Sequence, residues 1–106
     1  MTTTETGGWR RIETREEFVA AFADRPLVDD GIRFTITADG QISGSVDEQR
    51  FSGSWYWLDG FFCRTVCLNG KDLGLDCEII EQRGHQMRYT RNKGNGNSSI
   101  VEIGVE

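Results

Sequence analysis

The side chains suited to recognising a small ligand are arginines and aromatic residues in the second half of the chain. Segment 82–101 contains no acidic residue, although Arg83, His85, Arg88, Arg91 and Lys93 all lie in it. A guanidinium group pairs with anions and stacks on aromatic rings, so an arginine beside an aromatic wall suits a small anionic or aromatic ligand. A curved sheet would bring Arg64 close to Arg88 or Arg91, whereas the alternative is a solvated arginine face paired with the acidic strand before it. The predicted ligand-binding residues are Trp55, Tyr56, Trp57, Phe62, Arg64, Arg88, Tyr89 and Arg91.

Metal and acid–base chemistry find little support in the sequence. His85 is the only histidine, and it follows Gly84 in a predicted turn. Cys63 and Cys67 fall on one predicted strand, where residues four apart lie about 13 Å from each other. That separation is too large to share a zinc ion, whose bonds to sulfur are about 2.3 Å long. Asp76 and Glu78 share a strand face, which we interpret as an outward, solvated face. The alternative is that this face lies in a cleft. We therefore expect no bound metal, no cofactor and no enzymatic activity.

Composition and charge narrow the classes of protein further. A chain of 106 residues corresponds to one domain, residues 1–106. The net charge of −5 argues against binding to nucleic acid or to an anionic membrane, since both require a basic surface. Residues 1–8 lack the basic and apolar regions of a signal peptide, and we expect them to form a disordered tail. A cytoplasmic protein with cysteine thiols is therefore expected, although three cysteines also allow one disulfide.

A short helix is predicted close to the N-terminus. Thr14 and Glu17 have the spacing of a capping box, in which each side chain satisfies a backbone amide of the other. Phe18 and Phe22 follow at helical spacing, so the helix has one apolar face. Pro26 ends the helix after about three turns, because the residue before a proline avoids helical dihedral angles. Such a short helix must pack on the rest of the chain.

The rest of the chain has the pattern of consecutive antiparallel strands. Apolar residues alternate with polar ones from Ile32 to Ala38, which indicates a half-buried strand. Asp-Gly pairs then mark two hairpins. For the first, a three-residue loop that ends at Gly40 pairs Ile36 with Ile42 and keeps the two faces consistent. The same loop length around Asp59-Gly60 would pair Trp57 with Phe61 and Trp55 with Cys63.

This register places aromatic groups on both faces of the central hairpin. One face would carry Trp55 and Trp57, and the other would carry Tyr56, Phe62 and Arg64. Two apolar faces indicate a covered sheet, a barrel or a contact surface.

The next turn, at Asn69-Gly70, leads into a strand whose buried face would carry Leu73, Leu75 and Cys77. A five-residue loop over residues 68–72 would place Cys63 opposite Cys77, within reach of a disulfide. Further strands are predicted over residues 86–92 and 99–105.

Part of the sequence resembles a known group of proteins. Gly53-Ser54-Trp55, the hairpin that ends in Phe62-Cys63-Arg64 and the later Cys77 are similar to small bacterial calycin-like, or lipocalin-like, proteins of uncharacterised function. The resemblance covers residues 32–89. It implies an antiparallel meander that curls into a partial or closed barrel, with an interior site and with two cysteines facing each other.

The expected fold is mainly β, with the N-terminal helix packed on a strongly curved antiparallel meander of roughly six to eight strands. The alternative is an α+β, cystatin-like open sheet that wraps the helix. The leading functional hypothesis is a non-enzymatic binding protein that holds a small apolar or anionic ligand in the concavity of the sheet. The alternative is a protein-interaction domain, a homodimer that uses an aromatic sheet face. Burial of both Tyr56 and Phe62 within one chain would weigh against the homodimer.

Overall fold

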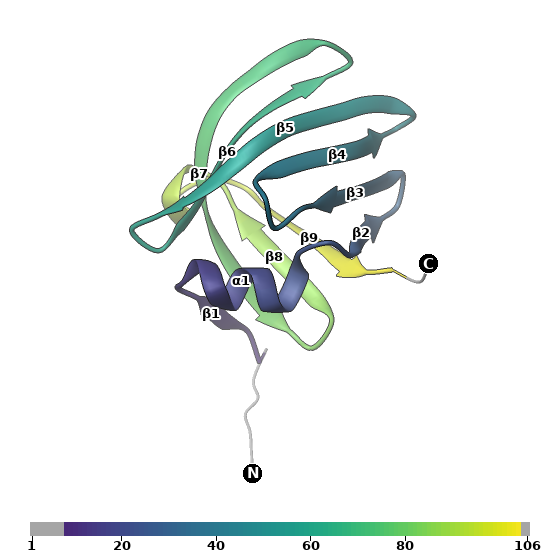
Figure 1. The fold of residues 1–106 in the computed structure, drawn as a ribbon. Coiled ribbons are helices and arrows are strands. Elements are labelled where there is room, and N and C mark those ends of the chain that lie inside the picture. Colours follow the sequence, from purple (N-terminus) through teal and green to yellow (C-terminus); the bar gives the residue numbers. More distant parts are fainter. Residues whose placement is uncertain (1–7, 105–106) are drawn as a thin grey trace.

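The computed structural model describes residues 8–104, and these residues form a closed antiparallel β-barrel. Over this part of the chain the wall consists of eight consecutive strands, each paired with the next, and the last pairs with the first (Figure 1). The strands are β2 (Pro26–Asp29), β3 (Ile32–Ile36), β4 (Gln41–Val46), β5 (Gln49–Leu58), β6 (Phe61–Leu68), β7 (Lys71–Arg83), β8 (Gln86–Thr90) and β9 (Ser98–Ile103), with the 3-10 turn η1 (Asn92–Gly94) between β8 and β9. Closure confirms the predicted curved meander and excludes the open, cystatin-like sheet.

The predicted helix is present as α1 (Arg15–Phe22), and its capping box is confirmed. The Thr14 hydroxyl accepts a hydrogen bond from the Glu17 amide at 3.2 Å, and the Glu17 carboxylate accepts one from the Thr14 amide at 3.3 Å. The helix is shorter than predicted, because Ala23 already has extended backbone angles, three residues before Pro26. Before the helix, β1 (Arg10–Ile12) pairs with β7 beyond the end of β6.

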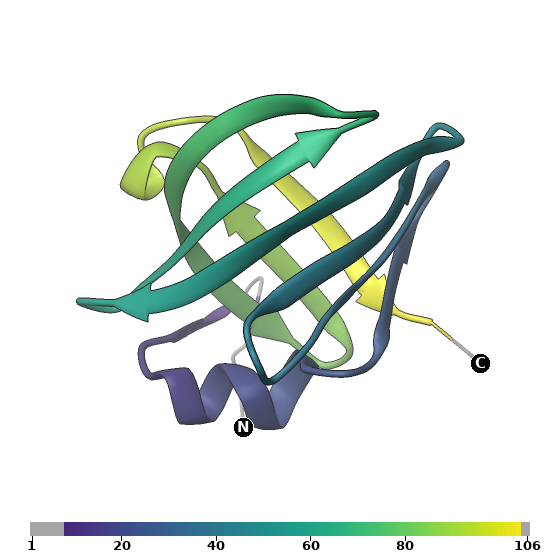
Figure 2. The ribbon, with the colours of Figure 1, turned by 45° about the horizontal axis from the view of Figure 1, so that its top comes forward.

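Helix α1 closes one end of the barrel (Figure 2). Phe18 and Phe22 are fully buried. The Phe18 ring lies 5.2 Å from the Trp55 ring and 5.0 Å from the Phe62 ring, measured between centroids. Such aromatic contacts contribute beyond the burial of apolar area alone. The helix therefore gains its stability from the barrel interior, as its short length requires.

The two Asp-Gly hairpins differ in register, and one prediction was wrong. Ile36 pairs with Ile42 as predicted, and Gly40 has the expected positive φ of 102°. In the second hairpin, however, Asp59 and Gly60 both have positive φ, 53° and 84°, and form a two-residue turn. This turn type matches the twist of the adjoining strands and pairs Leu58 directly with Phe61.

The corrected register changes which side chains of the central hairpin face inward. Trp57 now pairs with Phe62 and Trp55 with Arg64, so these four residues share the inner face. Trp55 and Phe62 are only 6% and 4% exposed, whereas Tyr56 points outward and is 48% exposed. The sheet therefore has one aromatic inner face, rather than comparable aromatic groups on both faces. The buried indole N–H of Trp55 donates a hydrogen bond to the Thr37 carbonyl at 2.9 Å.

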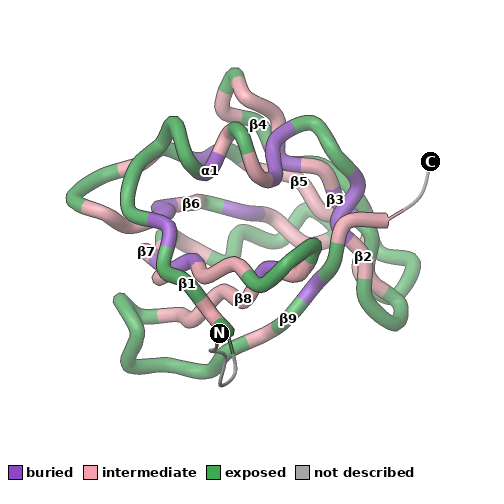
Figure 3. The backbone as a smooth tube through the Cα atoms, turned by 90° about the horizontal axis from the view of Figure 1, so that it is seen from below, coloured by how far each residue is buried: buried purple, intermediate pink, exposed green. Residues whose placement is uncertain are grey.

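Strand β7 contains a bulge that reverses its predicted faces. Asn69-Gly70 makes a two-residue turn in place of the predicted five-residue loop, and an extra residue near Gly74 restores the pairing of Cys63 with Cys77. Beyond the bulge, Leu75 lies outside and is 59% exposed, whereas Glu78 is buried and only 3% exposed. The interpretation of Glu78 as an outward, solvated residue was therefore wrong. Figure 3 shows the resulting alternation of buried and exposed segments along the strands.

Other predictions have mixed outcomes. Strand β2 was not predicted, because a proline at its first residue resembles only the end of the helix. The disordered tail predicted for residues 1–8 falls almost entirely on residues 1–7, which lie outside the described part of the chain. No helix within residues 8–104 is long and apolar enough to cross a membrane.

Candidate ligand-binding cavity

The barrel encloses a cavity of about 270 Å³. Its aromatic lining comes from Phe34, Phe51, Phe62 and Tyr89, and most of the remaining wall is aliphatic. Small-molecule sites have volumes of roughly 300–1,000 Å³ and predominantly apolar walls with a few polar groups. The cavity lies close to the lower limit of that range, so it suits a compact ligand.

Helix α1 lies at one end of the barrel, and the β4–β5 and β6–β7 turns lie at the other end (Figures 1 and 2). The cavity lining reaches the residues beside these two turns. The lining residues closest to the turns at this end are accessible: Leu73 is 49% exposed, and Val46, Phe51 and Leu68 are half-buried. At the opposite end Phe18 of α1 is fully buried. The accessible end of the cavity is therefore bordered by apolar side chains.

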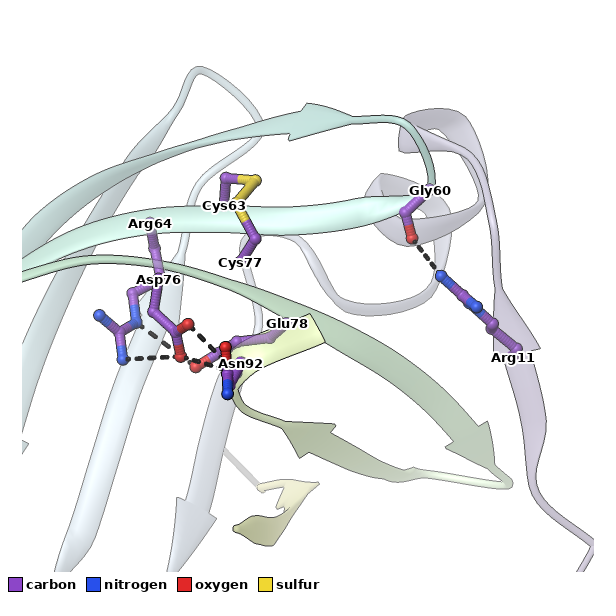
Figure 4. Close-up of a disulfide and its surroundings, with 8 residues drawn as sticks. All are labelled: Arg11, Gly60, Cys63, Arg64, Asp76, Cys77, Glu78 and Asn92. Carbon is purple, nitrogen blue, oxygen red and sulfur yellow. Dashed lines mark hydrogen bonds and ion pairs between the residues drawn. A yellow bond between two sulfur atoms is a disulfide. The ribbon is translucent and has the colours of Figure 1, made fainter. Parts of the chain in front are cut away.

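One wall of this apolar cavity carries an ionic cluster (Figure 4). The Arg64 Nε atom lies 3.4 Å from a Glu78 carboxylate oxygen, and Arg64 Nη2 lies 3.8 Å from Asp76. Arg64 also donates to the Gly74 carbonyl at 3.2 Å, so the bulge in β7 helps to fix its direction. Asp76 in turn accepts from the backbone amide of Asn92 at 3.1 Å, which connects β7 to the turn after β8.

A second arginine reaches the cavity from the end of β8. Arg91 donates to the Asn97 carbonyl and to the Ser99 hydroxyl, each at 3.2 Å. Its guanidinium group lies 5.2 Å from the centre of the Tyr89 ring, a cation–π distance. Burial raises the pKa of the Tyr89 hydroxyl above its ordinary value, so this group stays neutral and able to donate at physiological pH.

Burial dominates the protonation of Glu78. It raises the pKa of the Glu78 carboxyl from 4.5 to about 7, because the charged form loses its hydration. The nearby Arg64 charge lowers this pKa in part, and the negative charge of Asp76 raises it again. The Arg64–Glu78 pair is thus balanced between an ion pair and a neutral carboxyl beside a cation near neutral pH.

The structure brings together four of the eight predicted ligand-binding residues. Phe62, Arg64, Tyr89 and Arg91 all line the cavity. Arg91 rather than Arg88 is therefore the arginine that joins Arg64.

The other four predicted residues lie elsewhere. Trp55 and Trp57 face inward but contact the helix end, where the Trp57 indole donates to the Glu13 carbonyl at 3.0 Å. Tyr56 and Arg88 lie on the outer face, and Arg88 forms an ion pair with Glu81 at 2.8 Å. The expected role of these four residues in a ligand site has no support from their positions.

Sequence reasoning missed three polar residues of the cavity region. Glu78 and Ser99 line the cavity, and Asp76 contacts Arg64 beside it. The sequence shows that Asp76 and Glu78 share one strand face. The bulge that turns this face inward is marked in the sequence only by Gly74. Ser99 pairs with Tyr89 across the β8–β9 ladder, so a correct register for these two strands would have placed it in the cavity wall.

The structure pairs Cys63 with Cys77 in a disulfide between β6 and β7, and Cys67 remains a half-buried thiol (Figure 4). The pairing of these two cysteines follows the prediction, although the turn that produces it does not. Because disulfides are rare in the cytoplasm, the bond removes one of the reasons for expecting a cytoplasmic protein.

The homodimer hypothesis loses part of its basis. Phe62 faces the interior, so only Tyr56 of the two diagnostic side chains stays exposed. No group of three or more His, Cys, Asp or Glu residues within 8–104 is arranged to hold a metal ion. The cavity combines apolar walls with the ionic and polar side chains of Arg64, Glu78 and Arg91.

Fold and cavity together define a calycin-like barrel: an eight-stranded up-and-down antiparallel barrel whose described part includes one helix at a closed end. No family model, no curated protein and no solved structure matches this chain. The structure therefore supports the barrel that the resemblance implies, and the likeness to small bacterial proteins of this fold stays a prediction.

Proposed function

We propose that this protein binds a compact, largely apolar small molecule inside the barrel, with one polar end of the ligand at the Arg64 and Arg91 wall. The observation that carries the proposal is the cavity of about 270 Å³, which has apolar walls, an open end and ionic groups confined to one side. A barrel that served only as a rigid scaffold would gain stability by filling this space, since empty volume in a core costs free energy.

The polar wall supports the same proposal. Buried ionic pairs cost desolvation energy, and apolar residues of similar volume are often no less stable in their place. Arg64 has a side chain only 15% exposed, and Glu78 only 4%. Polar groups set in an apolar cavity fix the orientation of a ligand and provide specificity.

The test uses N-phenyl-1-naphthylamine, a neutral apolar dye whose fluorescence rises when it leaves water. We expect saturable binding to the purified protein and displacement of the dye by octan-1-ol. Val66, which is 3% exposed and lines the cavity, is replaced by phenylalanine. Leu68→Trp near the mouth provides a second blocking variant, in case Val66→Phe disturbs folding. Thr65→Phe, exposed on the outer face of the same strand, is the matched control.

The inner substitutions should reduce dye binding at least about tenfold, because they occupy the space of the ligand. The outer substitution should leave binding unchanged. Equal binding by the three folded variants would place the dye on the surface and would contradict the proposal. Folding of each variant is checked by its near-ultraviolet circular dichroism.

A further inference from the structure

The carboxyl group of Glu78 is the feature of the cavity that ligand binding alone leaves unexplained. One of its oxygens faces Arg64 Nε at 3.4 Å, and the other has no hydrogen-bond partner among residues 8–104. The residue is 3% exposed and lines the cavity. Burying a carboxylate with such incomplete hydrogen bonding is costly, so its retention in this wall calls for a role.

The charges around Glu78 come from three strands and nearly cancel. Arg64 faces it from β6, Asp76 lies two residues away on β7, and Arg91 and Tyr89 face it from the end of β8. With Glu78 ionised, its negative charge and that of Asp76 balance the two arginines. With Glu78 protonated, the wall carries one net positive charge.

The two arginines retain donors for an additional partner. An arginine side chain has five N–H donors. Arg91 uses one N–H donor of each terminal nitrogen, for its hydrogen bonds to Asn97 and Ser99. Arg64 directs its bonds to Gly74, Asp76 and Glu78. If Glu78 becomes neutral, the Arg64 charge is no longer balanced by it, and an anion in the cavity can take its place.

We propose that the cavity takes up a monoanionic ligand, an apolar molecule with one carboxylate or similar group, together with one proton that Glu78 carries. This inference rests on the proposed function, since it concerns the same cavity. In the bound state the ligand carboxylate replaces the Glu78 carboxylate as the counter-charge of Arg64. The proton comes from the buffered solvent, and its positive charge offsets the negative charge of the ligand. The occupied cavity is therefore neutral, as the empty cavity is when Glu78 is ionised.

Electrostatics dictates the direction of this coupling. A second negative charge beside Glu78 disfavours its ionised form, so a bound anion raises the affinity of Glu78 for a proton. By linkage, protonation of Glu78 raises the affinity for the anion to the same extent. A pKa of about 7 for this group in the unliganded protein makes both forms available near neutral pH. A neutral ligand has no such effect, and a cation is repelled by both arginines.

Isothermal titration calorimetry with octanoate tests the inference, and octan-1-ol serves as the matched neutral ligand. Titrations in phosphate and in Tris, which differ in ionisation enthalpy, measure the protons taken up at each pH. We expect octanoate to take up a fraction of a proton at about pH 7. We expect its affinity to fall by up to about tenfold per pH unit above that value, as linkage requires. Octan-1-ol should bind without proton uptake and without this dependence on pH.

The variant Glu78→Gln keeps the size of the side chain but removes the titration. It should bind octanoate without proton uptake, and its affinity should no longer depend on pH. Glu102→Gln, an exposed position on β9, should behave as the unsubstituted protein. Octanoate binding without proton uptake, or uptake that persists in Glu78→Gln, would overturn the inference.

The naphthylamine dye separates failure of this inference from failure of the proposed function. If the dye binds inside the barrel but octanoate does not, the inference is refuted and the proposed function stands. If neither binds, both are refuted.

Discussion

Replacing Glu78 by glutamine should change the stability of the protein in a way that depends on pH. Glutamine has nearly the same size as glutamate and can still accept a hydrogen bond from Arg64, whose Nε atom lies 3.4 Å from the carboxylate. It therefore imitates the protonated form of Glu78 at every pH. The difference in free energy of unfolding between the two proteins reports the cost of ionising this buried side chain.

The magnitude follows from the pKa of the carboxyl group, which burial raises from 4.5 to about 7 in the folded protein. Each pKa unit corresponds to about 1.36 kcal/mol, so the ionised side chain destabilises the folded state by about 3 kcal/mol. Because the folded protein binds the proton more tightly than the unfolded chain, this cost is absent below about pH 4.5, grows as the pH rises and is complete above about pH 7. We expect Glu78→Gln to be more stable than the unsubstituted protein by about 3 kcal/mol at about pH 8, and to differ little at about pH 4.5.

Urea unfolding followed by tryptophan fluorescence measures this difference across the pH range. Glu102→Gln removes the same charge from an exposed site and should change the free energy by less than about 0.5 kcal/mol. The opposite outcome has a physical basis, because removing one partner of a buried ion pair can cost about 3–5 kcal/mol. A variant that is less stable than the unsubstituted protein at high pH would show that Arg64 stabilises the ionised Glu78 in full, and would refute the reasoning.

Two further predictions concern the helix and the disulfide. Phe18→Ala should lower the free energy of unfolding by about 3–5 kcal/mol, because a fully buried ring at the closed end of the barrel leaves a void. Glu16→Ala, at an exposed position of the same helix, is the control. A decrease in the free energy of unfolding of Phe18→Ala below about 1 kcal/mol would contradict the packing of α1 against the barrel interior. Replacing both Cys63 and Cys77, 14 residues apart, by serine should cost about 3 kcal/mol, the value for a loop of that length. Cys67→Ser should cost less, and peptide mapping that finds Cys67 in the bridge would refute the pairing.

The elements of the fold were largely accessible from sequence, but the register was predicted correctly for only one of the two Asp-Gly hairpins. Thr14 and Glu17 predict the start of α1 correctly, since a capping box acts through bonds between neighbours in the chain. Asp39-Gly40 and Asp59-Gly60 are identical dipeptides in different turns. The pair itself permits two or three loop residues, and the choice depends on which side chains reach the core. Those contacts form only in the folded barrel.

The cavity was predictable to the extent that strand alternation determines it. Tyr89 and Arg91 share a face because they are two residues apart, and the same rule places Arg88 outside. Glu78 could not be placed, because the bulge at Gly74 changes the alternation along β7. Bulges depend on the curvature that a barrel imposes on paired strands, which is a property of the whole sheet.

The junction between β2 and β9 has a consequence for how the proposed ligand would enter and leave the barrel. This is the pairing of the barrel wall that does not join consecutive strands. Within residues 8–104 its ladder contains two pairs, Leu27–Ile103 and Val28–Glu102. One more backbone bond, from the Gly104 amide to the Pro26 carbonyl, lies beside it. Short ladders open locally at a lower free energy than the whole structure. Opening here would uncover the side of the cavity while every hairpin stays intact. The residence time of a ligand would then follow this local fluctuation rather than the width of the mouth.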